Sequence, residues 1–116
     1  MEILEINKVF DDLANAQISS YLAAETAGSL NAKLKFGKAQ ALLDGKIEGK
    51  NEEMREAAAR TVFYDLYAQV DQANAELRLS AYKLTQAQIA VDRITWTIRY
   101  LETVQPAPKK ATRKRV

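Results

Sequence analysis

The chain has 116 residues and a formal net charge of +2, and it contains neither cysteine nor histidine. This composition excludes a disulfide framework, a zinc site of the usual Cys and His kind, and a Ser-His or Cys-His nucleophile. Because histidine is the commonest general base near neutral pH, we expect no enzyme, no catalytic residues, no metal and no cofactor. The length predicts a single domain.

The charge is distributed unevenly along the chain. The last eight residues hold five of the 17 basic residues and no acid, which leaves 12 Lys and Arg against 15 Asp and Glu, a net charge of −3 for residues 1–108. A short basic segment after two prolines is typical of a disordered arm, so we assign 106–116 to a disordered basic tail. Such an arm suits the phosphate backbone of a nucleic acid. An acidic protein surface, or no specific partner, are the alternatives. The basic residues are Lys109, Lys110, Arg113, Lys114 and Arg115.

The first hundred residues predict helices and no strand. Alanine is abundant, which favours helix, and no long run alternates apolar and polar residues. A first helix is predicted over about 3–27, where Ile3, Ile6, Phe10 and Leu13 share one face. A shorter helix is predicted over 29–43. Gly28 is a natural stop or bend, although fusion of the two helices past it stays open.

After a turn over residues 44–50, a third helix is predicted from 51 to about 104. Asn51 is a good N-cap, and Glu52, Glu53 and Glu56 lie where the helix dipole favours negative charge. We attribute these acids to the helix start and reject a metal or acid–base site. At about 1.5 Å per residue the helix would be roughly 80 Å long. It must therefore break at a point that the sequence does not mark, or pack along other chains.

A heptad pattern on this third helix favours packing along other chains. Apolar residues recur every seven positions for six repeats, and a second row follows each of them by three. This a/d pattern is typical of a coiled-coil seam. The same pattern would also serve a helix folded back on the first two, so pairing within and between chains both remain open. The first row is Phe63, Val70, Leu77, Leu84, Val91 and Ile98, and the second is Leu66, Ala73, Ser80, Ala87, Ile94 and Leu101.

A second apolar stripe lies on a different face of the same helix. A helix with two apolar faces has two neighbours, so we predict a homo-oligomer and place the heptad row together with Trp96 and Tyr100 in its interface. The stripe consists of Leu79, Tyr82, Ile89, Trp96 and Tyr100.

Further basic residues outside the tail are candidate nucleic-acid contacts. Lys33, Lys35 and Lys38 cluster without acids near the glycines, although lysines at such places are commonly just exposed. Arg93 and Arg99 interleave with aromatic residues, as in platforms for single strands, but a solvated flank beside an oligomer core is the preferred interpretation.

The N-terminus carries acids where a signal peptide needs basic residues, and no apolar run approaches the length of a membrane span. We therefore expect a soluble, cytoplasmic protein without a membrane partner.

The segment Glu48–Ala57, which opens the third helix, resembles a pattern in small helical proteins of bacteriophages. The layout of a lysine-bearing helix, a glycine turn and a long helix is similar in outline to the UvsY-type recombination mediators. This resemblance covers about half of the chain. It implies a helical oligomer that binds single-stranded DNA and helps to load a recombinase.

From these observations we expect an all-α helical hairpin with one long heptad-patterned helix, assembled as an oligomer. The expected function is that of a non-enzymatic, DNA-associated accessory protein of phage type, binding single-stranded DNA as a recombination mediator inside a bacterial host cell. One alternative is a phage protein-interaction module that inhibits a host protein or defence system. Another is a structural coiled coil.

Overall fold

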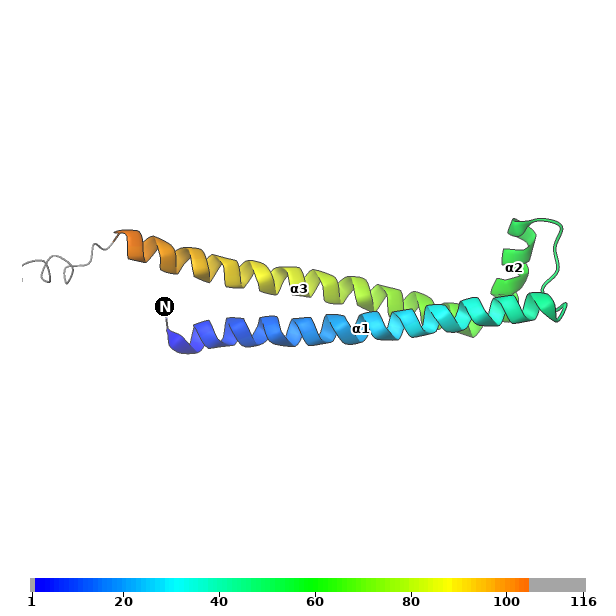
Figure 1. Ribbon diagram of the computed structural model, residues 1–116, viewed down its shortest axis with the longest axis horizontal. Coiled ribbons are helices and arrows are strands. Elements are labelled where there is room, and N and C mark those ends of the chain that lie inside the picture. Colours follow the sequence, from blue (N-terminus) through cyan, green and yellow to red (C-terminus); the bar gives the residue numbers. More distant parts are fainter. Residues whose placement is uncertain (1, 105–116) are drawn as a thin grey trace, which may run out of the picture.

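The computed structural model describes residues 2–104, which form a long antiparallel hairpin of two helices with a short helix at its closed end (Figure 1). The long helices are α1 (Ile3–Leu43) and α3 (Tyr64–Val104), and α2 (Glu52–Val62) lies between them in sequence. The molecule measures 88 × 25 × 18 Å, with a radius of gyration of 25.7 Å. A compact domain of this length has a radius of gyration of roughly 13 Å. The predicted all-α hairpin is confirmed, and its shape is that of a rod.

The two helices predicted over 3–27 and 29–43 are one continuous helix, α1. Gly28 is exposed and does not interrupt it. A single glycine costs a helix interior about 1 kcal/mol, which is too little to break a helix that is held on both sides. Ala27 beside it is only 2% exposed, and the Asn31 side chain donates a hydrogen bond to the Ala27 carbonyl oxygen at 2.7 Å.

The heptad row of α3 packs along α1 of the same chain. Of the two predicted rows, all but Ile98 and Leu101 are buried or half-buried. The facing residues of α1 alternate at three- and four-residue spacing and are likewise buried or half-buried: Ile6, Val9, Leu13, Ala16, Ser20, Ala23, Ala27, Leu30, Leu34, Gly37 and Ala41. The seam therefore closes within one chain. Ile3 and Phe10, predicted on this face, are 75% and 47% exposed.

The predicted rod over 51–104 breaks at Phe63, a residue that no glycine or proline marks. Its backbone leaves the helical region, with φ −110° and ψ 36°. The Phe63 N–H still bonds to the Ala59 carbonyl at 2.8 Å, and the Tyr67 N–H bonds to the Phe63 carbonyl at 2.9 Å. The chain thus turns between two regular helices. Packing compensates for the lost continuity, because Ala59 is 1% exposed and the Phe63 ring lies against Gly37.

The connection between α1 and α2 is fixed by specific residues. Gly45 has φ +75°, a conformation that glycine adopts without strain. Ile47 is buried in the core cluster. Asn51 caps α2 as predicted, since its side-chain oxygen accepts a hydrogen bond from the Met54 N–H at 2.9 Å.

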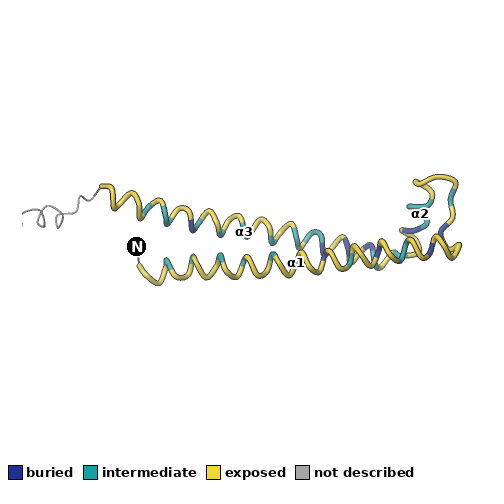
Figure 2. The backbone as a smooth tube through the Cα atoms, in the orientation of Figure 1, coloured by how far each residue is buried: buried dark blue, intermediate teal, exposed yellow. Residues whose placement is uncertain are grey.

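The core is concentrated at the closed end of the hairpin. It comprises Leu34, Ala41, Ile47, Ala59, Tyr67 and Val70. Toward the other end the helices separate and burial becomes partial (Figure 2). We call this second part, with the N-terminal half of α1 and the C-terminal half of α3, the open half. None of the described helices is both long and apolar enough to cross a bilayer.

Candidate functional site

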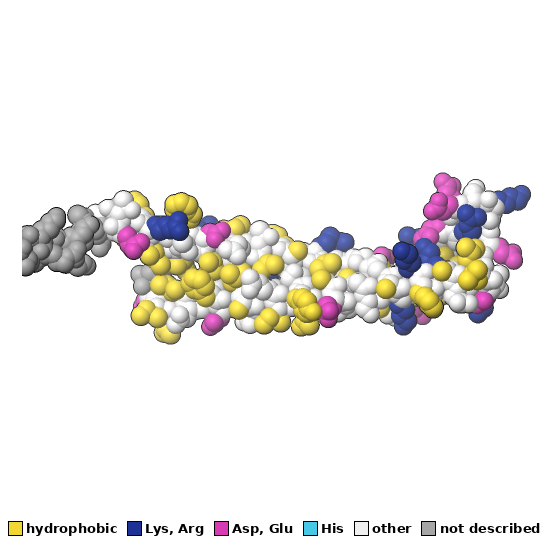
Figure 3. Space-filling view, viewed as in Figure 1, with side chains coloured by type: hydrophobic (Ala, Val, Ile, Leu, Met, Phe, Trp, Pro, Cys, Tyr) yellow, Lys and Arg dark blue, Asp and Glu magenta, His cyan; other side chains and the backbone are white. Residues whose placement is uncertain are grey.

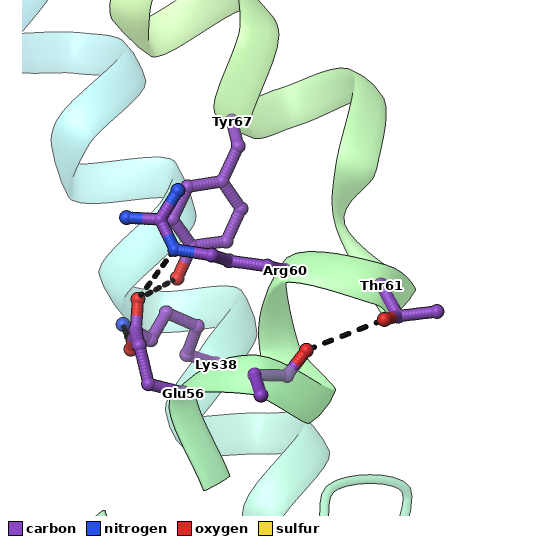
Figure 4. A network of polar contacts seen from close by, with 6 residues as sticks. Lys38, Glu56, Arg60, Thr61 and Tyr67 are labelled. Carbon is purple, nitrogen blue, oxygen red and sulfur yellow. Dashed lines mark hydrogen bonds and ion pairs between the residues drawn. The ribbon is translucent and has the colours of Figure 1, made fainter. Parts of the chain in front are cut away.

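A polar cluster joins all three helices at the closed end, and we call its four residues the clasp: Lys38, Glu56, Arg60 and Tyr67 (Figure 4). Lys38 Nζ of α1 lies 2.7 Å from Glu56 Oε2 of α2, and the Tyr67 hydroxyl of α3 donates a hydrogen bond to Glu56 Oε1 at 2.6 Å. Arg60 Nε lies 3.7 Å from the same Glu56 Oε1. The Arg60 guanidinium stacks over the Tyr67 ring, 4.6 Å from its centroid.

The clasp favours the charged forms of Glu56 and Lys38. The hydrogen bond from Lys38, reinforced by the one from Tyr67, lowers the pKa of Glu56 below its ordinary value. In return, the hydrogen bond to Glu56 raises the pKa of Lys38. Both carboxylate oxygens are occupied by partners of the same chain, so the clasp stabilises the fold and offers no free acid or base. Within residues 2–104, no three acidic side chains converge as metal ligands would.

The basic contacts predicted on α1 and in the tail fall into three groups. Lys33 and Lys35 are exposed on α1. Lys38 is half-buried and paired with Glu56, so its charge contributes to the fold. The predicted tail contacts Lys109, Lys110, Arg113, Lys114 and Arg115 lie outside the described residues.

The arginine and aromatic residues near the end of α3 are exposed. Trp96 and Tyr100 are each 65% exposed, and Arg93 is exposed beside them. The Arg99 guanidinium lies 5.4 Å from the centroid of the Trp96 ring, within the range of a cation–π contact. This face carries no part of the core of its own chain.

The predicted oligomer-interface residues divide between two faces. The first five residues of the heptad row contribute to the seam with α1, so they are not available to another chain in this fold. Ile98 is 41% exposed at the open end, and Trp96 and Tyr100 lie on the outer face of α3. Five of the predicted interface residues therefore lie in the seam within their own chain: Phe63, Val70, Leu77, Leu84 and Val91.

A second exposed apolar face lies on α1, and the sequence alone did not separate it from the packing side of that helix. Leu4 and Ile18 lie on the side opposite the seam, with Tyr21 and Leu22 beside them. We call these four residues the α1 outer face. The α3 outer face consists of Tyr82, Ile89, Trp96 and Tyr100. The sequence does contain a signal for this face. Its apolar residues fall between the positions that recur every three or four residues along the seam.

The surface reflects this division between the two ends. Hydrophobic side chains gather over the half of the hairpin that contains the N-terminus, whereas charged side chains crowd around α2 (Figure 3). An open groove also runs between α1 and α3, lined largely by small and polar side chains such as Ala16, Ser19, Ala23 and Ser80. Asp12, Glu76 and Lys83 contribute the charged side chains of this groove.

No protein-family model matches the chain, and comparisons with curated proteins and with solved structures give no significant match either. The resemblance to UvsY-type mediators therefore stays an expectation from the sequence.

Proposed function

We propose that this protein is a non-enzymatic accessory protein that binds nucleic acid, single-stranded DNA in preference, and acts as an oligomer. The observation that carries the proposal is the segregation of charge. The five basic residues of 109–116 follow closely after the end of α3 at Val104, while residues 1–108 have a net charge of −3. Lys33 and Lys35 are exposed and form no ion pair within the described residues, which leaves them available as secondary contacts.

The mechanism we propose is avidity. Each Lys or Arg that neutralises a phosphate releases counterions, and for a single strand the slope of log K against log salt is about −0.7 per contact. Five contacts from one tail would give a slope of about −3.5. One arm of this kind binds weakly, but several arms on one oligomer raise the effective concentration of each other and can strengthen binding by orders of magnitude.

The test is fluorescence anisotropy of a labelled single-stranded oligonucleotide, titrated with the full chain at about 50 mM and about 200 mM salt. We expect binding at the lower salt and strong weakening at the higher. A variant with all five tail residues replaced by Gln should lose binding. The control replaces Lys83, which is exposed on α3 and is not among the predicted contacts, and should bind as the parent does. Absence of binding by the full chain at about 50 mM salt would show that the proposal is wrong.

A second candidate function, a protein-interaction module, is favoured by the exposed apolar outer faces. Contiguous apolar surface of more than a few hundred Å² marks interaction sites on proteins. Under this alternative, Trp96→Ala would abolish capture of a host protein, while the Gln variant of the tail would leave it unchanged. The narrower expectations of a recombination mediator, a phage origin and an inhibitor of host defence stay predictions.

A further inference from the structure

The two outer faces point away from each other, because each lies on the side of its helix opposite the seam. Their exposed apolar area is on the order of 450 Å² per face, since an aromatic side chain presents about 150–250 Å² and these residues are 43–77% exposed. A standard interface buries about 800 Å² per partner, of which somewhat more than half is apolar. Each face therefore has the size of one interface.

Charge distinguishes the two faces. Asp11 and Glu25 lie on the same outward line of α1 as Leu4 and Ile18, at intervals of seven residues, and both are exposed. Within the described residues neither Asp11 nor Glu25 forms an ion pair, although Glu25 accepts a hydrogen bond from the Tyr21 hydroxyl at 3.1 Å. The one base beside this line in the described part of the chain, Lys8, is paired with Asp12 at 2.8 Å.

The α3 outer face is instead flanked mainly by arginines. Arg78, Arg93 and Arg99 are exposed beside it, and the one acid there, Asp92, accepts a hydrogen bond from Gln88 at 3.0 Å. If two α1 outer faces met, carboxylates would lie against carboxylates. If two α3 outer faces met, guanidinium groups would lie against guanidinium groups. Pairing α1 with α3 of another copy joins opposite charges.

The register of the hairpin supports this pairing. Asn31 of α1 donates a hydrogen bond to Asn74 of α3 at 3.2 Å, and the two helices run antiparallel with equal rise. Counting outward from this pair places Asp11 level with Ile94, one residue from Arg93, and Glu25 level with Ser80, two residues from Arg78. Ile18 falls level with Ala87, two residues from Ile89. In copies that lie side by side at the same height, acidic residues of one copy would therefore lie near basic residues of the next, and apolar residues near apolar residues.

We propose that the α1 outer face of one copy binds the α3 outer face of the next copy of this chain. The contact is head-to-tail, so every copy uses both faces, and the assembly grows beyond a dimer into a closed ring or an open row. A two-fold dimer would bury one kind of face and leave the other exposed. The inference rests on the oligomer of the proposed function and specifies its interface.

The experiment measures mass by light scattering without nucleic acid, so that failure of this interface and failure of DNA binding are separate results. Ile18→Glu damages only the α1 outer face, and Trp96→Glu damages only the α3 outer face. We expect the parent to exceed a dimer and each variant alone to be a monomer. An equal mixture should form a 1:1 dimer that grows no further, because each variant keeps one intact face.

The matched control is Leu43→Glu, at a residue 81% exposed and outside both faces, which should assemble as the parent does. Circular dichroism checks that every variant keeps the helical content of the parent. Where either variant fails this check, Leu22→Lys replaces Ile18→Glu and Tyr82→Glu replaces Trp96→Glu. A parent that is a monomer or stops at a dimer would overturn the inference. So would a single variant that keeps the size of the parent, or a mixture that stays monomeric.

Discussion

At the scale of single residues, the four glycines do different things although the sequence presents them alike. Gly28 has open space where a side chain would stand. Gly37 lies under the Phe63 ring, with the place of a Cβ atom 3.3 Å from it, and the same place at Gly49 is 2.8 Å from the backbone nitrogen of Arg55. Sequence reasoning treats every glycine as a helix breaker, whereas the space around each one in the fold decides what a side chain there would meet.

Gly28→Ala should therefore stabilise the protein. Alanine is favoured over glycine in a helix interior by about 0.5–1 kcal/mol, and nothing at this site meets the added methyl group. Urea unfolding followed by circular dichroism, at one protein concentration for all variants, should show a higher midpoint.

Gly49→Ala is the contrasting variant, because its methyl group would require backbone of α2 to move. Its unfolding midpoint should fall. Equal effects of the two substitutions would contradict this account of the glycines.

At the scale of elements, α2 is held by the clasp and by a small set of buried residues. Ala59 packs in the core cluster with Ile47, and Glu56 ties α2 to both long helices through Lys38 and Tyr67. The sequence predicted the start of this helix correctly, because a cap is a local feature. It could not predict the end at Phe63, because the contacts that favour the turn come from α1.

The clasp makes the stability of the fold depend on pH in a defined direction. The folded state lowers the pKa of Glu56, so its contribution is fully present above the pKa of the unfolded chain and is lost as pH falls through the lower folded value. The melting temperature of the parent should drop between about pH 7 and about pH 3.

Glu56→Gln isolates this contribution. The variant should melt below the parent at about pH 7, and the difference between them should shrink as the pH falls through the lowered pKa of Glu56, below which the parent carboxylate is protonated as well. A difference that stays constant across this range would show that the charge of Glu56 does not matter. Glu53→Gln is the matched control, since it lies exposed in the first turn of the same helix.

At the scale of the whole molecule, the hairpin uses one face of each long helix and leaves the opposite faces to solvent. The closed end is stabilised by its core and clasp. The open half instead exposes the apolar residues of the two outer faces to solvent. A rod with two complementary outer faces is suited to lateral assembly, and assembly would bring the basic segments of several copies close to one another.

Exchanging the acid of one outer face with the base of the other tests the proposed contact between copies, and the parent protein is the reference. Asp11→Arg and Arg93→Asp should each weaken assembly several-fold, as expected for the loss of one exposed pair worth roughly 0.5–1 kcal/mol. Combined in one chain they should restore it, because every interface then again opposes one acid and one base. Sedimentation velocity at low salt measures the change. A double variant weaker than both single variants would contradict the proposed register.

The sequence by itself determined the helical class, the cap at Asn51, the heptad row of α3 and its second apolar stripe. These are local or periodic features, and each follows from spacing along one helix. Only the tertiary structure decided that the heptad row closes on α1 of the same chain, that α1 passes through Gly28 and that the chain turns at Phe63. It also decided that Lys38 is paired with Glu56. The physical reason is common to all four, because each depends on contacts with a distant part of the chain; at Gly28 the neighbouring Ala27 makes these contacts.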